Sequence, residues 1–390
     1  MIGRLNMTKF DEDYIKLLNK ILDEGVEVEN RTGVNTIKVP EHTFYFDLKD
    51  EFPILTTKQM FHKQAILEML WIWQMASNDV RDLHERGVHI WDEWMIDEDG
   101  IYRIYEPVTE CYDSDKEVVV LDPLSVPIDN PNLKMSPKLD TNGNVFTAKS
   151  KIPGKNIKEA RYYGKEYAYT IGTAYGYIVN RYQHTRNLID TIKNNPNDRR
   201  MVKSLWQDEF LRTAVLPSCV WSTEWDVTKD KLNLMVHQRS CDVPLGLPFN
   251  VTQYATLLKM IAQVTEKEAG AISYSIKDAH IYKNQLIGIK EQLKRYKKYQ
   301  EIKKDDLYSL GLRRIFTERL LDESEKDTDF YKSLETELKM IDMLLTKEKP
   351  ELVLNKDITD FFSFDNSKEL KDIKVRGYKH MGKINFPITQ

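Results

Sequence analysis

Cysteine is scarce in this chain of 390 residues, which contains three: Cys111, Cys219 and Cys241. They show no C-x-x-C spacing, whereas disulfide frameworks and structural zinc sites need several suitably spaced thiols. The sequence therefore predicts neither a disulfide scaffold nor a metal site. Since a lone cysteine is most often a small buried hydrophobic residue, a chemical role for any of them has to be argued from its neighbours.

Long apolar runs and an excess of one charge are also missing. No segment approaches the roughly 18 apolar residues of a membrane span, and the first residues, MIGRLNMTKF, lack the apolar core of a secretory signal. Lysine and arginine number 57 against 61 aspartate and glutamate, a net charge of -4, which gives no electrostatic reason to expect a polyanionic partner. We therefore expect a cytoplasmic protein that binds neither membranes nor nucleic acids.

The most informative stretch is 216–254, LPSCVWSTEWDVTKDKLNLMVHQRSCDVPLGLPFNVTQY. Cys219 follows a proline turn, a strand-like alternating run leads to the motif QRSCD at 238–242, and the motif GLPFN follows at 246–250. A thiol attacks as the thiolate, and a nearby guanidinium stabilises that anion. Cys219 and Arg239 are therefore candidates for a nucleophile and its partner, with a buried structural cysteine as the competing interpretation.

These three motifs, in this order and at this spacing, resemble the active-site region of the thymidylate synthase family. In that family a cysteine after a proline-rich turn precedes a Q-R-S-x-D strand and an L-G-x-P-F-N turn. Ser218 departs from the pattern, because the family usually has a second proline there. The resemblance implies that the Cys219 thiolate adds to C6 of a pyrimidine nucleotide. It also implies 5,10-methylenetetrahydrofolate as the one-carbon co-substrate, without a metal.

Asn250, the last residue of the GLPFN motif, is the candidate for choosing the base. A carboxamide can accept a hydrogen bond from N3–H and donate one to O4 of uracil, and mismatched buried polar groups are costly. Cytosine-specific relatives have aspartate at the matching position. The resemblance therefore implies that the substrate is dUMP and not dCMP.

Further motifs extend the resemblance along the chain. Glu68 lies within an apolar run, where a carboxylate needs a partner or a raised pKa, although a polar helix face would explain it equally well. Arg31 lies in a polar R-T-G loop, where an arginine is usually only solvated. The other matching motifs are WDEW at 91–94, GTAYG at 172–176 and DAHIY at 278–282.

The resemblance assigns a role to each matching residue. The expected catalytic residues are Cys219, Glu68, Tyr175, Arg239 and Asn250. The expected contacts of the nucleotide are Arg31, Arg199, Arg200, Gln238, Ser240, Asp242, Asn250, His280 and Tyr282. The expected contacts of the folate are Lys58, Trp91, Trp94 and Asp242. Because the family's paired arginines reach into the neighbouring subunit's site, Arg199 and Arg200 imply a homodimer.

The sequence leaves the last step of the reaction open. Hydride from tetrahydrofolate would give thymidylate (dTMP) and dihydrofolate, whereas water would give 5-hydroxymethyl-dUMP, and the outcome depends on water exclusion. Most synthases have histidine at the position of Val220 and end in an apolar residue, where this chain has Thr389 and Gln390. Together with the chain length, these features resemble the phage dUMP hydroxymethylases, so hydroxymethylation, for modified phage DNA in a host cytoplasm, is narrowly favoured. Thymidylate synthesis is the alternative, and a catalytically silent nucleotide- or RNA-binding paralogue is a remote third.

The fold implied by the resemblance is α+β. It is a single thymidylate-synthase-like catalytic domain over 1–390, in which a large mixed β-sheet with flanking helices packs against its copy in a homodimer. Local patterns agree with that class, because apolar spacing predicts helices over 10–24, 63–75 and 254–264 and alternation predicts a strand over 36–46.

Two segments depart from the family pattern and are interpreted as insertions. The first, at about 96–169, is rich in Asp, Pro, Asn and Lys and contains one apolar burst that predicts some β structure. The second, at about 296–348, is dense in Lys and Glu with apolar residues at helical spacing. The sequence assigns neither of them a function.

Overall fold

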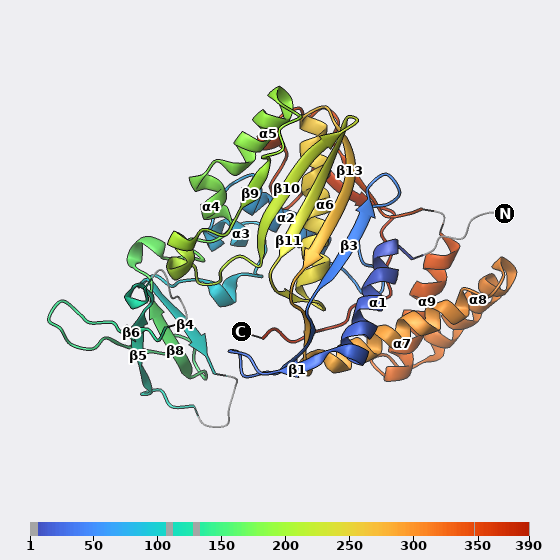
Figure 1. The fold of residues 1–390 in the computed structure, drawn as a ribbon. Helices are drawn as coiled ribbons and strands as arrows, with labels where there is room; N and C mark the ends of the chain where they lie inside the picture. Colours follow the sequence, from blue (N-terminus) through green and yellow to red (C-terminus); the bar gives the residue numbers. More distant parts are fainter. Residues whose placement is uncertain (1–6, 107–111, 128–132, 347, 390) are drawn as a thin grey trace.

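The computed structural model describes residues 7–106, 112–127, 133–346 and 348–389. Its main sheet runs in the order β3-β13-β11-β10-β9, with β11 and β13 parallel and the other neighbours antiparallel (Figure 1). The chain is therefore α+β with a mixed sheet, as the sequence predicts. The strands are β3 (His42–Asp47), β9 (Val202–Ser204), β10 (Val220–Thr228), β11 (Lys231–Gln238) and β13 (Glu268–Ile276).

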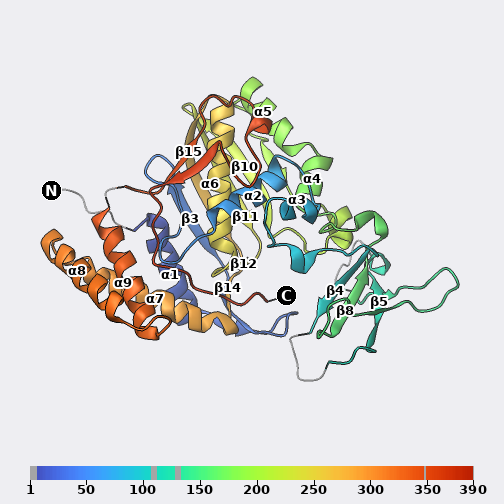
Figure 2. The ribbon, with the colours of Figure 1, turned by 180° about the vertical axis from the view of Figure 1, so that it is seen from behind.

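Helices cover one face of the main sheet because apolar residues alternate along its strands. In β11, Leu232, Leu234 and Val236 are buried while the residues between them are partly exposed, and alternate residues of a strand share one face. Helix α6 (Gly246–Val264) packs on this buried face, and α2 (His62–Trp73) packs against α6 within the same core. The strands lie in front of both helices in Figure 1 and behind them in Figure 2.

Helix α1 (Lys9–Glu24) confirms the predicted opening helix. Its Phe10 ring lies 5.9 Å from that of Phe44 and 5.4 Å from that of Phe46, both on β3, so it covers the β3 edge of the same sheet. The remaining helices around the sheet are short and carry loops: α3 (Val80–His84), α4 (Gly176–Arg181), α5 (His184–Asn194), and the 3-10 turns η1 (Asp92–Trp94), η4 (Asp208–Thr213), η5 (Lys283–Gln285) and η6 (Phe361–Ser363).

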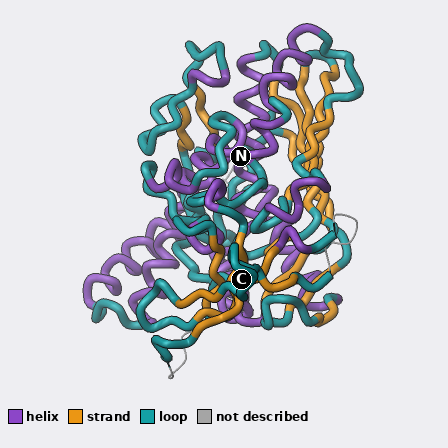
Figure 3. The backbone as a smooth tube through the Cα atoms, turned by 90° about the vertical axis from the view of Figure 1, so that its left-hand side faces the viewer, coloured by secondary structure: helices purple, strands orange, loops and turns teal. Residues whose placement is uncertain are grey.

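The opposite face of the main sheet is open in the single chain. Tyr45 on β3, Trp221 on β10 and Val202 on β9 are 53%, 39% and 48% exposed. Figure 3 shows the strands from the side, as a layer beside the helices. Large apolar side chains gathered on one exposed surface are typical of an interaction face.

A second sheet combines two strands from the N-terminal part of the chain with two from its C-terminal half. Its order is β1-β2-β14-β12. The strand predicted over 36–46 is in fact two strands, β2 and β3, which belong to different sheets. Pro40 lies between them, and a proline offers no N–H to continue a ladder. The strands of this sheet are β1 (Val26–Val28), β2 (Thr36–Val39), β12 (Cys241–Asp242) and β14 (Ala279–Tyr282).

The sequence predicts that the motif at 246–250 is a turn that precedes a helix. In the structure the motif instead forms the first turn of helix α6. The helix predicted over 254–264 therefore starts eight residues earlier, at Gly246. Pro248 is tolerated there because the first-turn N–H groups of a helix have no intrahelical partner. Asn250 consequently projects from a rigid helix end that packs against the sheet.

The first interpreted insertion forms a small sheet of its own, in the order β4-β8-β5-β6 with β7 beside β5, at the lower left of Figure 1. Arg212 joins it to the main body, because Nη1 donates to the carbonyls of Leu124 at 2.9 Å and Val126 at 2.7 Å. Val215, four residues before Cys219, belongs to the same buried cluster as Tyr102. The elements are β4 (Ile101–Tyr105), β5 (Glu117–Asp122), η2 (Pro123–Ser125), β6 (Ser136–Pro137), β7 (Thr147–Lys149), β8 (Ile157–Tyr162) and η3 (Lys165–Tyr167).

The second interpreted insertion is helical, as its sequence pattern predicts. Helices α7 (Leu286–Ile302), α8 (Leu307–Glu323) and α9 (Asp329–Leu345) lie at the lower right of Figure 1. The predicted boundary near residue 296 falls inside α7. After these helices, β15 (Glu351–Leu354) and β16 (Ile373–Arg376) pair as a separate two-stranded antiparallel sheet.

No helix in the described part of the chain is long and apolar enough to cross a membrane. Cys219 and Cys241 are free thiols. Cys111 and Gln390, which the sequence analysis considered, lie outside the described residues.

Candidate active site

Cys219 lies immediately before β10, on a segment fixed through its main chain. Its N–H donates to the Tyr175 hydroxyl oxygen at 2.8 Å, and its carbonyl accepts from the N–H of Arg239 at 2.9 Å. The side chain is partly exposed, whereas the neighbouring Val220 is buried. The thiol is thus held by groups on two other segments while staying reachable from solvent.

Arg239 braces the turn that carries Cys219. Its guanidinium donates from Nε to the carbonyl of Ser218 at 3.1 Å and from Nη2 to that of Pro217 at 2.7 Å. Its Cζ atom lies 5.5 Å from the centroid of the Trp206 ring, within the range of a cation–π contact. The structure therefore brings Arg239 and Cys219 together, as predicted, through the two carbonyls that precede the thiol.

Tyr175 connects the Cys219 turn to the helical layer. Its backbone has φ +49°, in the left-handed region that a bulky residue rarely adopts, and such outliers cluster at functional sites. Burial, followed by the charge of Cys219, raises the pKa of its phenol well above the ordinary value. The phenol therefore stays protonated and can donate one hydrogen bond in addition to the one that it accepts.

Glu68 is a buried carboxylate with two side-chain donors. It is 8% exposed on α2, Oε1 accepts from Trp91 Nε1 at 2.7 Å, and Oε2 accepts from Gln253 Nε2. Burial raises the pKa of Glu68 to about 7, and the two hydrogen bonds only partly oppose this rise. The polar-surface alternative is therefore wrong for this glutamate, and its carboxyl group can exchange a proton near neutral pH.

A chain of side-chain amides leads from Glu68 to Asn250. Asn250 Nδ2 donates to Gln253 Oε1 at 3.1 Å, and Asn250 Oδ1 accepts from Gln238 Nε2 at 3.3 Å. Gln238 is fixed in turn by Tyr274, whose hydroxyl donates to Oε1 at 2.6 Å. Both glutamines are buried and Asn250 is partly exposed. Asn250 is therefore the partly exposed member of a hydrogen-bonded network whose glutamines are buried.

Trp91 contacts the Glu68 carboxylate, and Trp94 packs against Trp91. The Trp91 ring lies 5.5 Å from the rings of both Trp94 and Tyr175. Because Trp91 also donates to Glu68, contacts run without interruption from Cys219 through Tyr175 and Trp91 to Glu68. The structure thus gathers four predicted residues into one network.

His280 and Tyr282 occupy one end of the second sheet. Their rings are 5.2 Å apart on β14, and His280 Nδ1 lies 2.9 Å from an Asp278 carboxylate oxygen. Burial and the charge of Asp242 raise the pKa of the Tyr282 phenol, while the positive charge of Arg31 opposes the rise. Arg31 is exposed on the loop before β2, so it is near this end of the site.

Lys58 is buried and Asp242 is partly buried, and the charges of the two side chains influence each other next to the C-terminal segment. Lys58 Nζ donates to the carbonyl of Pro244, and burial lowers the pKa of Lys58 to about 8 despite the opposing charge of Asp242. Asp242 accepts from Gln285 Nε2 at 2.9 Å, and burial raises its pKa. The ring of Phe386 lies 4.8 Å from Lys58 Nζ.

Arg199 and Arg200 stand apart from the network around Cys219. Both are exposed between α5 and β9, and Arg200 pairs with Asp198, with N–O distances of 2.9 Å. Ser240 lies between β11 and β12, where its carbonyl accepts from Gln238 Nε2 at 3.0 Å. Within one chain, the paired arginines are therefore not brought together with the other predicted residues.

The sequence analysis missed three residues that hold the site together: Gln253, Tyr274 and Gln285. Gln253 lies one helical turn after Asn250, and i, i+3 residues on a helix are neighbours. The spacing of three residues indicates a contact between Gln253 and Asn250 only if 246–250 is helical, and the sequence analysis interpreted that motif as a turn. Tyr274 and Gln285 lie far from Gln238 and Asp242 in sequence, so no local pattern indicates them.

Comparisons with known proteins agree with this geometry. The family model described as thymidylate synthase matches residues 12–310. The chain is 33% identical over 383 residues to a thymidylate synthase of Clostridium beijerinckii, a match that covers 98% of this chain and all of the relative. It is 28% identical over 401 residues to the thymidylate synthase of Bacillus phage phi3T, again covering 98% and 100%.

A solved structure, thermostable thymidylate synthase A from Bacillus subtilis, is also similar. It superposes with a TM-score of 0.61 at 28% identity, over 98% of this chain and 100% of that one. A family match that spans most of the chain and a full-length relative at 33% identity leave no other assignment. The chain belongs to the thymidylate synthase family of one-carbon transferases.

Proposed function

We propose that this protein is a thymidylate synthase that converts dUMP to dTMP, with 5,10-methylenetetrahydrofolate as the one-carbon donor and reductant. The observation that carries the proposal is the continuous network from the Cys219 turn through Tyr175, Trp91 and Glu68 to the amide of Asn250. A partly exposed thiol, a carboxyl group that titrates near neutral pH and a base-reading amide are thereby held together.

Cys219 supplies covalent catalysis. Its thiolate forms a bond to C6 of dUMP, the electron pair of the C5=C6 bond moves to C5, and C5 forms a bond to the one-carbon unit of the folate. Loss of the C5 proton and of the folate amine leaves an exocyclic methylene, which a hydride from tetrahydrofolate reduces to methyl as Cys219 departs. The folate supplies both the carbon and the hydride, and leaves as dihydrofolate.

Glu68 and Tyr175 handle protons in this scheme. Since the pKa of Glu68 is about 7, its carboxyl group can give a proton to the pyrimidine or folate and take one back in successive steps. Tyr175 holds the Cys219 turn by accepting its N–H, which leaves the phenol proton to orient a water molecule near C5.

The nucleotide phosphate is the expected ligand of arginine. Guanidinium groups offer forked donors and permanent charge, so we assign phosphate binding to Arg31, Arg239 and Ser240, completed by Arg199 and Arg200 of the partner subunit. His280 and Tyr282, adjacent on β14, take the deoxyribose hydroxyl. Gln238 and Asp242 complete the nucleotide contacts.

The folate is assigned to the surface formed by Trp91, Trp94, Lys58 and Asp242. Two indole rings at 5.5 Å provide flat apolar contact for an aromatic heterocycle. The Asp242 carboxylate and the Lys58 ammonium add an acceptor and a donor beside it. Phe386, which contacts Lys58, places the C-terminal segment against the same surface.

A homodimer is part of the proposal because Arg199 and Arg200 are exposed in the single chain and take no part in the network around Cys219. The open face of the main sheet carries the exposed side chains of Tyr45, Val202 and Trp221. Packing that face against a second copy would bury them and would bring each chain's paired arginines toward its partner.

Thymidylate formation is preferred here to the hydroxymethylation favoured by the sequence features. The Clostridium relative matches over 383 residues and its whole length, so the length of this chain no longer separates it from proteins named as synthases. Val220 does not decide the question, because some synthases share that valine. Hydroxymethyl-dUMP therefore stays as the second possible product.

One product assay separates the two outcomes. Purified protein is incubated with dUMP and methylenetetrahydrofolate, the nucleotide is identified by mass spectrometry, and dihydrofolate is followed by absorbance. We expect dTMP with equimolar dihydrofolate. Hydroxymethyl-dUMP without dihydrofolate would replace the proposal with water as the final nucleophile, and no new nucleotide at all would favour the silent paralogue.

A further inference from the structure

The first inference concerns Gln253 and rests on the proposed function. An asparagine amide does not by itself distinguish uracil from cytosine. With its oxygen toward N3 and its nitrogen toward position 4, it matches uracil, which offers N3–H and O4. Rotated by 180°, the same amide matches cytosine, which offers the N3 lone pair and a 4-amino group. Discrimination therefore depends on what fixes the direction of the Asn250 amide.

The hydrogen-bonded network fixes the direction of the Asn250 amide from two ends, Glu68 and Tyr274. Above the pKa of Glu68, about 7, the ionised carboxylate can only accept, so Gln253 presents Nε2 to it and Oε1 to Asn250. Asn250 then has to present Nδ2 to Gln253, at 3.1 Å. At the other end, the Tyr274 hydroxyl donates to Gln238 Oε1, so Gln238 presents Nε2 to Asn250 Oδ1 at 3.3 Å.

Rotating the Asn250 amide would break both of these contacts at once. Its oxygen would face Gln253 Oε1 and its nitrogen would face Gln238 Nε2, which leaves buried polar groups unpaired. Gln253 is 4% exposed and Gln238 is 3% exposed, so water does not readily replace the lost partners. We propose that Gln253 is the positioning residue that sets Asn250 for uracil.

The experiment compares the binding of dUMP and dCMP by calorimetry in the wild type and in Gln253→Leu. A site built to hydrogen-bond one base rejects the wrong one by about 10⁴-fold or more, and we expect Gln253→Leu to lose at least about tenfold of that preference. Gln263→Leu is the matched control, because Gln263 lies on the same helix and donates to the carbonyls of Asn355 and Ile358.

The outcomes separate this inference from the proposed function. If the wild type binds neither nucleotide, the proposed function fails. If the wild type prefers dUMP and Gln253→Leu prefers it equally, the role of Gln253 is overturned. Because Gln253 also donates to Glu68, Gln253→Leu should raise the apparent pKa in the pH profile of turnover, which loss of stability alone would not do.

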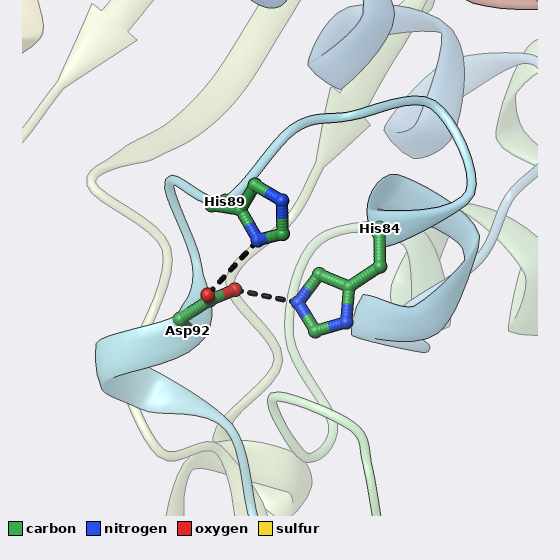
Figure 4. Close-up of side chains that lie close together, drawn as sticks. All are labelled: His84, His89 and Asp92. Carbon is green, nitrogen blue, oxygen red and sulfur yellow. Dashed lines mark hydrogen bonds and ion pairs between the residues drawn. The ribbon is translucent and has the colours of Figure 1, made fainter.

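The second inference concerns a side-chain cluster outside this network, at His84, His89 and Asp92. His84 ends α3, Asp92 begins η1, and the loop between them carries His89 (Figure 4). His84 Nε2 lies 2.6 Å from Asp92 Oδ1, and His89 Nδ1 lies 3.1 Å from Asp92 Oδ2. The two imidazole rings stack, with centroids 4.9 Å apart.

Two imidazole nitrogens and a carboxylate oxygen are the donors that Zn²⁺, Co²⁺ and Ni²⁺ accept. One donor atom from each residue lies within 4.8 Å of the others, whereas an ion with bonds of about 2.1 Å allows at most about 4.2 Å between donors. His84 is partly exposed while His89 and Asp92 are exposed, so their side chains are free to rotate by the small amount that would bring the three donor atoms onto one ion. We infer that the cluster binds one divalent transition ion, with water as a further ligand.

The proposed ion site adjoins the proposed folate surface, because Asp92 directly follows Trp91 in the sequence. Fixing Asp92 on an ion restrains Trp91, whose indole donates to Glu68. An ion here would therefore act as a brace for the tryptophan wall and not as a participant in the chemistry.

Binding of Co²⁺ to the purified full chain tests the site, by calorimetry and by the visible absorption of the bound ion. We expect one ion per chain, with affinity reduced at least about tenfold in both His84→Gln and His89→Gln. His237→Gln is the control, because His237 pairs with Glu224 at 2.8 Å but belongs to no three-donor group within the described residues. Equal binding by the wild type and the two cluster variants, or no binding, would overturn the inference.

Discussion

At the scale of single residues, the site combines groups whose properties are set by burial. Glu68 keeps a carboxyl group that titrates near neutral pH because it lies in the helical layer with only two donors. Lys58 loses basicity for the same reason. Tyr175, in contrast, is held protonated and adopts a strained backbone that aims its hydroxyl at the Cys219 turn.

Cys219→Ser should abolish turnover and retain nucleotide binding. A serine hydroxyl is a much weaker nucleophile without an adjacent base, so we expect turnover to fall by at least about 10³-fold. The thiol side chain does not hold the turn, since Tyr175 and Arg239 bind its main chain, and dUMP affinity should change little. Turnover measured by dihydrofolate absorbance, with dUMP affinity by calorimetry, checks both parts. Unchanged turnover in this variant would revive the silent paralogue.

Glu68→Gln should remove a pH dependence of stability. The pKa of Glu68 rises from an ordinary value of 4.5 to about 7 on folding, so between these pH values the folded chain holds a proton that the unfolded chain has released. The free energy of unfolding should therefore fall as pH rises from about 4.5 to about 7, by about 3 kcal/mol, and this contribution should level off above pH 7.

Urea unfolding of the wild type and of Glu68→Gln across pH 5 to about 7.5 measures this difference. The variant should lack this part of the slope, and its turnover should lose the proton-transfer step near neutral pH. Identical slopes for the two proteins would contradict the assignment of a raised pKa to Glu68.

At the scale of elements, three secondary-structure boundaries decide where the site residues point. Helix α6 starts at Gly246, which turns a predicted loop motif into a rigid helix end with Asn250 and Gln253 one turn apart. Helix α4 starts at Gly176, directly after Tyr175. β14 pairs with both β2 and β12, which places His280 and Tyr282 beside Asp242.

Gly176→Ala should disturb the contact that positions Tyr175. A methyl group at Gly176 would lie 1.8 Å from the carbonyl oxygen of Ser77, so α4 has to shift, at a cost of about 1–3 kcal/mol. Gly311→Ala in α8 is the control, because a methyl group there meets nothing within 4 Å and should stabilise that helix by about 0.5–1 kcal/mol. Urea unfolding should move the two variants in opposite directions, and turnover should fall only in Gly176→Ala. If both variants are stabilised, the close packing of α4 is wrong.

At the scale of the whole molecule, the main body carries two attached modules on opposite sides of Figure 1. The β module docks through Arg212 and shares a buried cluster with Val215, close to the Cys219 turn. The helical module contacts the C-terminal segment through Arg295, whose Nη1 donates to the carbonyl of Met381 at 3.0 Å. Each module therefore borders a segment that contacts candidate site residues, and neither module covers the sheet face that we propose for the dimer.

Mixing two inactive variants tests the dimer. Cys219→Ser chains lack the proposed nucleophile, and Arg200→Ala chains lack the proposed phosphate ligand of their partner. If Arg200 acts across the interface, the mixed dimer contains one intact site, and an equal mixture should recover about a quarter of wild-type turnover, because half of the dimers are mixed. No recovery after unfolding and refolding the mixture together would place Arg200 in its own chain's site or outside any site.

Trp221→Glu provides a second measurement at the same scale. A charge on the open sheet face should oppose the packing of two copies, and sedimentation should report a shift toward monomer. Leu320→Glu in α8 serves as the control for adding a charge to an exposed apolar position, because Leu320 is 45% exposed in the single chain. Equal dimerisation of the wild type and Trp221→Glu would place the interface elsewhere.

The sequence by itself determined the family and predicted the reacting groups, because the motifs that carry both are short and local in their spacing: the Cys219 turn, QRSCD, GLPFN and DAHIY. It also determined the α+β class and most helices, since apolar periodicity is a property of neighbouring residues. Only the tertiary structure decided that Glu68 is buried, that α6 begins at Gly246, and that Gln253, Tyr274 and Gln285 complete the site. Hydrogen-bond direction and burial depend on groups distant in sequence, and no local pattern contains them.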